Sequence, residues 1–308
     1  MPTNGSTEFN DGVILSLPAG QQAERRISRD SSAFGLRMTR GKNINMRLTA
    51  KAIYDKKAKR EKITVLTAYD FPFARILDEA GMDMILVGDS LGMVLLGYEN
   101  TVPVTMREML HHTRAVSRAV KRALVVADMP FGSYETPERA VRNAKRFLKE
   151  AGADGVKLEG GQKIQAQIET LVDAGIPVMG HVGMTPQTAS FLGGYRVQGK
   201  EKKQAAEIEK DARLLDRLGV FSLVLECVPA LLASKITREV KCPVIGIGAG
   251  PSVDGQVLVL HDMLGFHSKV HPRFVRQYAS LEREITAAVG KYRRDVINGK
   301  FPSKAESY

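Results

Sequence analysis

The sequence predicts a (β/α)8 barrel, also called a TIM barrel, in which eight parallel strands form a closed cylinder surrounded by helices. Short, nearly continuous apolar runs recur eight times between residues 63 and 262, as expected for parallel strands buried on both faces. Amphipathic stretches of helical length separate most of these runs, and this alternation is typical of the α/β barrel. A doubly wound open sheet is the structural alternative, but it usually has fewer strands.

The expected strands follow one another along the chain, and each is rich in β-branched and other large apolar residues. They cover residues 63–70, 84–90, 124–130, 155–160, 177–182, 222–228, 243–250 and 256–262. Such runs are too short to cross a membrane and have the length of buried strands.

Helices are expected over 107–120, 137–152 and 202–219, and their ends carry recognisable signals. Thr136 is a favourable N-cap, and Pro137 suits the first helical turn. Gly152 is placed to end the same helix in the left-handed conformation. Gly81 and Gly219 indicate two further helix ends of this kind.

The composition excludes several classes of protein. The chain has 308 residues, of which 44% are hydrophobic and 26% charged, so it is globular rather than disordered. No run of eighteen apolar residues occurs, so we expect no membrane partner. Cys227 and Cys242 are the only cysteines and belong to no CxxC or Cys/His cluster. This excludes a disulfide framework and disfavours structural zinc, and a reducing compartment such as the cytoplasm fits best.

The net charge of +11 lies in the two ends of the chain. Residues 1–62 carry 13 basic against 6 acidic groups, and residues 267–308 carry 9 against 4, whereas residues 63–266 are nearly neutral. A nucleic-acid-binding protein more often carries basic and aromatic residues together on its folded face. We therefore expect no nucleic-acid partner. A polyanion-binding module that uses the basic ends is the non-enzyme alternative, and removing residues 1–50 would abolish its binding.

Residues 1–50 differ from the rest of the chain and are interpreted as a mobile N-terminal extension. Residues 51–308 are expected to form a single barrel domain with a basic C-terminal helical segment. The apolar stretch at 13–20 is too short for a secretory signal, and four acidic residues argue against an organellar transit peptide. Organellar import remains an alternative to the cytoplasm. A third interpretation is that the start is extended or misassigned, since Met38 and Met46 both precede the folded part.

Polar residues stand where five of the expected strands end. These residues are Asp89, Asp128, Glu159, His181 and Glu226. In a parallel barrel these strand ends share one face, so residues distant in sequence converge there. Because a buried carboxylate is costly unless it is paired or binds a metal, five polar residues at five successive strand ends indicate a functional site.

The chemistry of these residues points to a small 2-oxo acid. Asp89, Asp128 and Glu159 are hard oxygen ligands that suit Mg²⁺, which retains water and binds a chelating substrate. Lys157 points to the same side of its strand as Glu159 and would neutralise an anionic group. The metal would act as a Lewis acid that stabilises an enolate, and Glu226 is the natural proton acceptor. We expect His181 to be a supporting hydrogen-bonded residue, with orientation of the substrate as its alternative role.

Many of these residues lie in strings that resemble the ketopantoate hydroxymethyltransferase family. The strings are LTAYD (66–70), LVGDSLGM (86–93), VPVT (102–105), VVADMPFGSY (125–134), VKLEGG (156–161), GHVGMTPQ (180–187), GGYRVQGK (193–200), VLECVP (224–229) and IGIGAG (245–250). They occur in the family's order, and matching strings run from about residue 63 to residue 274, which leaves out the N-terminal extension. The segment 265–274 and the basic ends depart from the family pattern.

The resemblance implies transfer of a hydroxymethyl group from 5,10-methylenetetrahydrofolate to 3-methyl-2-oxobutanoate, which gives 2-dehydropantoate for pantothenate biosynthesis. It implies that Asp89, Asp128 and Glu159 bind Mg²⁺, with Glu159 acting directly or through water. Asp89, Ser90, Asp128 and Lys157 match the oxo-acid site, and Glu226 matches the proton acceptor. The family further implies a barrel of the phosphoenolpyruvate/pyruvate type that assembles as a homodecamer.

Two enzyme alternatives remain. Lys157 could form a Schiff base with the keto group, but that requires a free amine, and three nearby carboxylates would keep the amine charged. A Mg²⁺ enzyme on a 2-oxo acid of the isocitrate lyase and phosphoenolpyruvate mutase group would share the barrel and the enolate chemistry. The cysteine-bearing loop of isocitrate lyase, KKCGH-like, is absent from the sequence.

Overall fold

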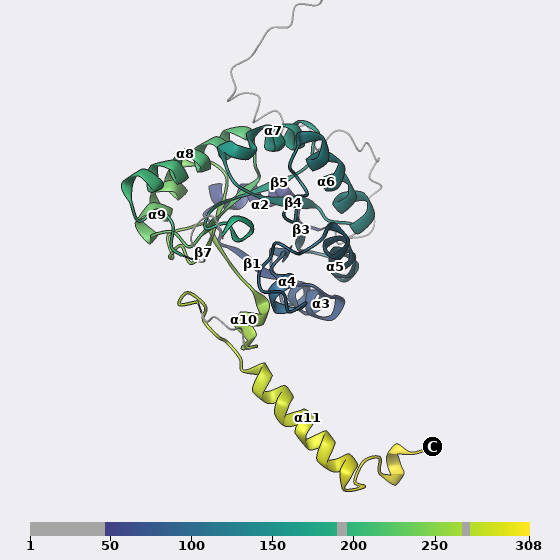
Figure 1. The fold of residues 1–308 in the computed structure, drawn as a ribbon. Helices are drawn as coiled ribbons and strands as arrows, with labels where there is room; N and C mark the ends of the chain where they lie inside the picture. Colours follow the sequence, from purple (N-terminus) through teal and green to yellow (C-terminus); the bar gives the residue numbers. More distant parts are fainter. Residues whose placement is uncertain (1–46, 190–195, 267–271) are drawn as a thin grey trace, which may run out of the picture.

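The protein is a closed barrel of eight parallel strands, as the sequence predicts. The computed structural model describes residues 47–189, 196–266 and 272–308. The strands pair in chain order, and β8 closes the cylinder onto β1. Figure 1 shows helices arranged around the strands. They are β1 (Ile63–Thr67), β2 (Met84–Val87), β3 (Leu124–Asp128), β4 (Gly155–Glu159), β5 (Val178–Gly183), β6 (Ser222–Glu226), β7 (Val244–Ile247) and β8 (Gly255–Leu258).

Helices cover the outside of the barrel and close its N-terminal end. The covering helices are α3 (Phe71–Glu79), α4 (Leu91–Val94), α5 (Met106–Ala119), α6 (Pro137–Ala151), α7 (Gln165–Asp173), α8 (Lys202–Leu218) and α9 (Ala230–Glu239). The helix α2 (Ala50–Ala58) inserts the fully buried Ile53 into the interior cluster beside the first residues of several strands. Single turns of 3-10 helix occur at Gln162–Ile164, Pro186–Thr188 and Lys304–Glu306.

The local signals in the sequence are confirmed for α6. The Thr136 side chain accepts a hydrogen bond from the backbone of Arg139, and Pro137 is the first helical residue. Gly152 has a φ of 74° and ends the helix in the left-handed conformation. Gly219 ends α8 in the same way, with a φ of 90°.

Four expected strands extend three or more residues too far at their C-terminal ends. The first stops at Thr67, and Asp70 is already the N-cap of α3. The second stops at Val87 because Gly88 and Asp89 turn into the short helix α4, for which Ser90 is the N-cap. The seventh stops at Ile247, where the glycine-rich loop begins. Residues 260–262, predicted as strand, begin the helix α10 (Leu260–Leu264). In each case the apolar pattern continues into the turn, so it does not mark where strand pairing ends.

Alternation along each strand decides which side chains enter the barrel. In β3, Val126 belongs to the interior cluster, whereas Val125 and Ala127 pack outward in the cluster that contains the helices. Because alternate strand residues point to opposite faces, Asp128 points inward. The same alternation carries other polar side chains into the C-terminal end of the interior, namely Lys157, Glu159, His181 and Glu226.

Acidic residues at the opposite end of the barrel have a structural role. Asp83, Asp154 and Asp254 each stand immediately before a strand. Each side chain accepts a hydrogen bond of 2.9 Å from the backbone N–H of the first or second residue of the preceding strand. These carboxylates therefore hold neighbouring strands in register and satisfy backbone donors at the strand starts. This repeated arrangement was not predicted from the sequence.

The C-terminal helix α11 (Leu281–Ile297) extends away from the barrel (Figure 1). It has no buried residue in the described part of the chain, although Ile285, Val289, Tyr292 and Val296 repeat along one face. Tyr292 contacts Phe301 with their ring centroids 5.4 Å apart.

The predicted extension of residues 1–50 lies outside the described residues except for its last four. In these, Arg47 donates hydrogen bonds to the carbonyls of Val120 and Gly152, and Ala50 begins α2. Both cysteines are free thiols. Within the described ranges, no helix combines the length and the apolar character that a membrane span requires.

Candidate active site

The polar residues singled out in the sequence meet at the C-terminal end of the barrel. Asp128, Glu159 and Glu226 are the last residues of β3, β4 and β6, and His181 lies within β5. Asp89 stands two residues beyond β2, in the turn that leads into α4. Strand pairing places Asp128 opposite Lys157 and Glu159 opposite His181. Neighbouring strands therefore bring these side chains together.

A chain of three buried side chains crosses the site from β3 to β5. The Lys157 ammonium lies 3.3 Å from Asp128 Oδ1 and 3.1 Å from His181 Nδ1. Lys157 is only 5% exposed, and its two partners are buried as well. Since an ammonium can only donate, Nδ1 of His181 accepts, which places the imidazole proton on Nε2.

His181 connects this chain to Glu226. Its Nε2 lies 3.2 Å from Glu226 Oε2, and its Nδ1 lies 3.5 Å from Glu159 Oε1. The Glu226 side chain keeps 13% of its surface exposed, whereas the His181 and Glu159 side chains keep 2%. Glu226 is therefore held by a buried imidazole on one side while it remains within reach of a ligand in the barrel mouth.

Gln187 joins two of the three carboxylates from the loop after β5. Its side-chain amide donates to Asp89 Oδ2 at 2.8 Å and to the Met129 carbonyl at 2.9 Å, and its backbone N–H donates to Glu159 Oε2 at 3.0 Å. The Tyr134 hydroxyl donates to Gln187 Oε1 at 2.6 Å. Both residues lie within the strings that carry the family resemblance, but neither was predicted to belong to the site, because loop residues follow no periodicity.

Ser90 and the turn before it complete the wall formed by β1 and β2. Ser90 Oγ lies 2.9 Å from the Tyr69 hydroxyl, and the backbone N–H of Asp89 donates to Asp128 Oδ2 at 3.1 Å. A Cβ atom on Gly88 would lie 2.7 Å from Ser90 Oγ and 3.5 Å from Asp128 Oδ2. The absence of a side chain at Gly88 thus allows the turn to approach β3 closely.

Burial raises the pKa of all three carboxyl groups. For Asp89 the loss of solvation is reinforced by the charges of Asp128 and Glu159. For Asp128 burial also dominates, although Lys157 acts against it. Burial raises the pKa of Glu159 to about 7. The site therefore holds more negative charge than its surroundings stabilise, and this favours a bound cation.

The environment of the site shifts the pKa values of Lys157 and His181 in opposite directions. Burial alone would lower the pKa of Lys157, but the charges of Asp128, Glu159 and Asp89 raise it above its usual value. Burial lowers the pKa of His181, and the nearby Lys157 charge lowers it further. Lys157 is therefore a charged ammonium at neutral pH, and His181 is a neutral imidazole.

The described side chains offer oxygen atoms to a cation without forming a complete cage. Asp128 Oδ1 and Glu159 Oε1 are buried and take part in no hydrogen bond within the described part of the chain. Hard carboxylate oxygens of this kind fit Mg²⁺. Among residues 47–189, 196–266 and 272–308, no three His, Cys, Asp or Glu side chains are gathered closely enough to hold a metal ion by themselves. This fits a cation that retains water and substrate among its ligands.

Comparison with known proteins identifies close relatives over most of the chain. The model of the family described as ketopantoate hydroxymethyltransferase matches residues 47–304. The 3-methyl-2-oxobutanoate hydroxymethyltransferase of Moorella thermoacetica is 57% identical over 264 residues, which are 85% of this chain and 98% of that protein. The protein of the same name from Flavobacterium johnsoniae is 49% identical over 272 residues, which are 88% of this chain and 100% of that protein.

Solved structures of more distant proteins share the barrel. A phosphonopyruvate hydrolase in complex with oxalate and Mg²⁺ aligns with a TM-score of 0.57 at 13% identity, over 84% of this chain and 93% of that chain. A phosphoenolpyruvate phosphomutase from Streptomyces platensis subsp. rosaceus aligns with a TM-score of 0.56 at 16% identity, over 82% and 88% of the two chains. At such low identity the likeness concerns the fold alone.

Proposed function

The chain belongs to the ketopantoate hydroxymethyltransferase family, and from this premise we propose how its site works. It transfers a hydroxymethyl group from 5,10-methylenetetrahydrofolate to 3-methyl-2-oxobutanoate and gives 2-dehydropantoate. One observation carries the assignment of roles. Buried Asp128, Lys157 and His181 and partly exposed Glu226 form a continuous series of contacts between 3.1 and 3.3 Å at the barrel mouth. These contacts place the Lys157 ammonium, which can bind an anion, and the proton acceptor Glu226 on the same face of the site.

Asp89 and Asp128 would hold Mg²⁺, with Glu159 completing the ligand set directly or through a water molecule. When bound, the cation supplies Lewis-acid polarisation of the substrate's keto group. Asp128 Oδ1, which contacts only the Lys157 ammonium at 3.3 Å, and Glu159 Oε1 accept no hydrogen bond from the described residues, and this supports the assignment. Mg²⁺ is commonly bound by one or two carboxylates together with water and substrate oxygens, so the lack of a closed cage of three protein ligands is consistent with it.

Lys157 and Ser90 would bind the oxo acid. The ammonium of Lys157 is charged, buried and already engaged by Asp128, so it neutralises the substrate carboxylate without a change in its own protonation. Ser90 Oγ is held by the Tyr69 hydroxyl and offers a hydrogen bond to the same substrate. These contacts would orient C3 of the substrate toward Glu226.

Glu226 would accept the proton from C3 of 3-methyl-2-oxobutanoate. The methylene carbon is bonded to N5 and N10 of the folate. Hydrolysis breaks both carbon–nitrogen bonds: water supplies the oxygen, its two protons pass to the nitrogens, and the products are tetrahydrofolate and a formaldehyde-level carbon. The electron pair left at C3 then forms the new carbon–carbon bond to this carbon, and its oxygen takes up the proton that Glu226 removed, which gives the hydroxymethyl group. The neutral His181, whose Nε2 lies 3.2 Å from Glu226 Oε2, would orient this carboxylate, so we assign it as a positioning residue.

The imine mechanism is disfavoured by the same geometry. A Schiff base requires a neutral amine at Lys157, and the surrounding carboxylates raise the pKa of that amine rather than lower it. Sodium borohydride added with the oxo acid should therefore trap no covalent adduct. A stable adduct on Lys157 would overturn the assignment of this residue as an ammonium.

A direct transfer assay tests the proposed function. The full chain, supplied with the oxo acid, the methylene folate and Mg²⁺, should form 2-dehydropantoate, and a chelator should abolish this activity. Glu226→Gln should lower kcat by about 100-fold or more, in keeping with the loss of a general base. Glu207→Gln on the exposed side of α8 is a matched control with no expected effect. Failure of the wild-type chain to form product would overturn the proposal.

We also propose a homodecameric assembly in the cytoplasm. The apolar face of α11, whose residues Ile285, Val289, Tyr292 and Val296 are spaced at intervals of three and four, supports contact with another copy. Two free thiols fit a reducing compartment. Light scattering that found only a monomer at micromolar concentration would contradict the assembly.

A further inference from the structure

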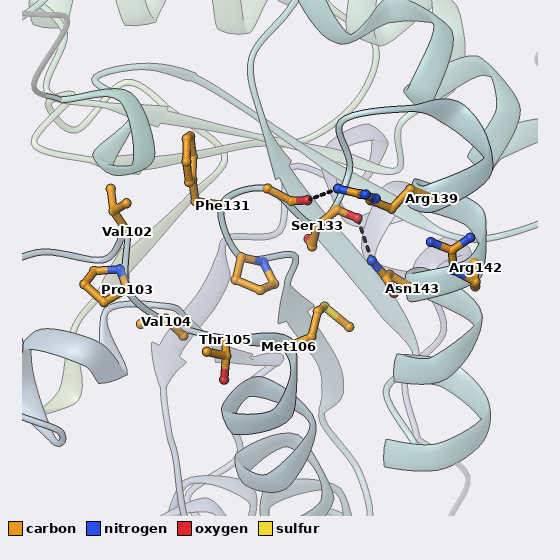
Figure 2. Close-up of a pocket in the computed structure, with 12 residues that line it drawn as sticks. Val102, Pro103, Val104, Thr105, Met106, Phe131, Ser133, Arg139, Arg142 and Asn143 are labelled. Carbon is orange, nitrogen blue, oxygen red and sulfur yellow. Dashed lines mark hydrogen bonds between the residues drawn. The ribbon is translucent and has the colours of Figure 1, made fainter.

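An open cavity of about 470 Å³ lies beside the active site, between the loops that follow β2 and β3. Residues 102–106 and 130–133 form two of its sides, and Arg139, Arg142 and Asn143 of α6 form the third (Figure 2). Its size is within the range of ligand-binding pockets. None of these residues belongs to the group that holds the oxo acid in the function proposed above.

One side of this cavity is apolar and the other is cationic. Val102 and Phe131 are 40% and 47% exposed, although they are large hydrophobic residues. Across from them, Arg139 donates to the Gly132 carbonyl at 3.3 Å and pairs with Glu135. The guanidinium of Arg142 makes no hydrogen bond or ion pair within the described part of the chain. The lining formed by the described residues includes two arginines and no carboxylate.

A buried hydroxyl adds to the polar character of the cavity. Ser133 is 4% exposed, and its Oγ has no hydrogen-bond partner among the described residues. Its carbonyl is occupied, since it accepts from the Asn143 side chain at 2.7 Å. A buried polar atom without a partner is costly, so a ligand that hydrogen-bonds to Ser133 Oγ would relieve that cost.

The cavity and the active site share one wall. The strand β3 ends at Asp128, and the next residues, 129–134, run between the two sites. Both ends of this segment contact Gln187, through the Met129 carbonyl and the Tyr134 hydroxyl, and its middle lines the cavity. A ligand lying across Phe131 can therefore have one end beside the carboxylates and the other beside the arginines.

We propose that this cavity binds the p-aminobenzoyl-glutamate portion of the folate cosubstrate, an inference that rests on the function proposed above. The aromatic ring would stack on Phe131, with Val102, Pro103 and Pro130 around it. A glutamate carboxylate would pair with Arg142, whose planar guanidinium matches carboxylate geometry, since Arg139 is already paired with Glu135. The one-carbon end of the same molecule would then lie toward Glu226 and the oxo acid.

Replacing Arg142 tests the inference. Arg142→Ala should raise the KM for monoglutamyl methylenetetrahydrofolate by about tenfold, the effect of losing one charge-assisted hydrogen bond. The KM for the oxo acid should stay at the wild-type value. Arg146→Ala is the matched control, because Arg146 lies one turn further along α6 and pairs with Glu150 at 3.0 Å. It should leave both KM values as they are.

A folate cosubstrate that lacks the glutamate provides a second test of the inference. With methylenetetrahydropteroate, wild type and Arg142→Ala should have the same KM, because the carboxylates that Arg142 binds are missing. An equal rise with both cosubstrates, a rise in the KM for the oxo acid, or a change in assembly size at unchanged KM would each overturn the inference. A wild-type chain that transfers normally while Arg142→Ala has no effect refutes this inference alone. A wild-type chain that transfers nothing refutes the proposed function.

Discussion

Replacing Glu159 with glutamine should stabilise the protein at pH 8 when divalent cations are absent. Burial raises the pKa of Glu159 from an ordinary 4.5 to about 7. A raised carboxyl pKa means that the folded state holds the proton more tightly than the unfolded state. The protonated Glu159 side chain therefore contributes fully to the stability of the folded state below pH 4.5, and this contribution is lost as the pH rises through 7. At about 1.4 kcal/mol for each pKa unit, ionised Glu159 costs about 3 kcal/mol at pH 8.

Denaturant unfolding in the presence of a chelator measures this cost. Because the chain has no tryptophan, circular dichroism at one fixed protein concentration is the suitable signal. Glu159→Gln should shift the unfolding midpoint upward at pH 8 and have little effect at pH 5, and the exposed Glu207→Gln should shift neither. Adding Mg²⁺ should reverse the order at pH 8, since wild type keeps the better ligand. A Glu159→Gln variant that is less stable than wild type in chelator at pH 8 would refute the reasoning.

Two further substitutions test the other charged groups. Lys157→Gln removes the cation from three buried carboxylates, so it should destabilise the chelated protein by about 3 kcal/mol at pH 8 and by less at pH 5, where the carboxylates are more protonated. Equal destabilisation at both pH values in denaturant unfolding would contradict this. Asp89→Asn should weaken Mg²⁺ binding at least tenfold by calorimetry and raise the KM for the oxo acid. Unchanged Mg²⁺ affinity would remove Asp89 from the ligand set.

The periodic part of the structure could be predicted from the sequence because burial dictates it. Apolar runs located all eight strands, and the signals at Thr136, Pro137 and Gly152 located α6 to within one residue. Strand ends were less accurate, since the apolar pattern around Val87 and Leu260 continues into turns and helices. Hydrogen bonding between strands ends at these residues because the backbone turns into α4 and α10, and the apolar pattern of the sequence does not predict these turns.

The residues of the candidate site likewise include some that could be predicted from the sequence and some that could not. Residues carried by strands, such as Asp128 and Glu159, could be predicted because the closed barrel brings strand ends to one face. Gln187 and Tyr134 could not, because they are brought to the carboxylates by the paths of two loops. The pairing of His181 with both Lys157 and Glu226 likewise depends on side-chain conformations that alternation along a strand leaves open.

Proton exchange at C3 of 3-methyl-2-oxobutanoate tests the central claim most directly, because it isolates the step assigned to Glu226. The full chain is incubated with the oxo acid and Mg²⁺ in heavy water without folate, and deuterium at C3 is followed by NMR. Exchange should occur, should stop in chelator, and should fall by about 100-fold in Glu226→Gln while Glu207→Gln exchanges at the wild-type rate. Exchange that persists in Glu226→Gln at the wild-type rate, or that is absent from the wild-type enzyme, would contradict the account.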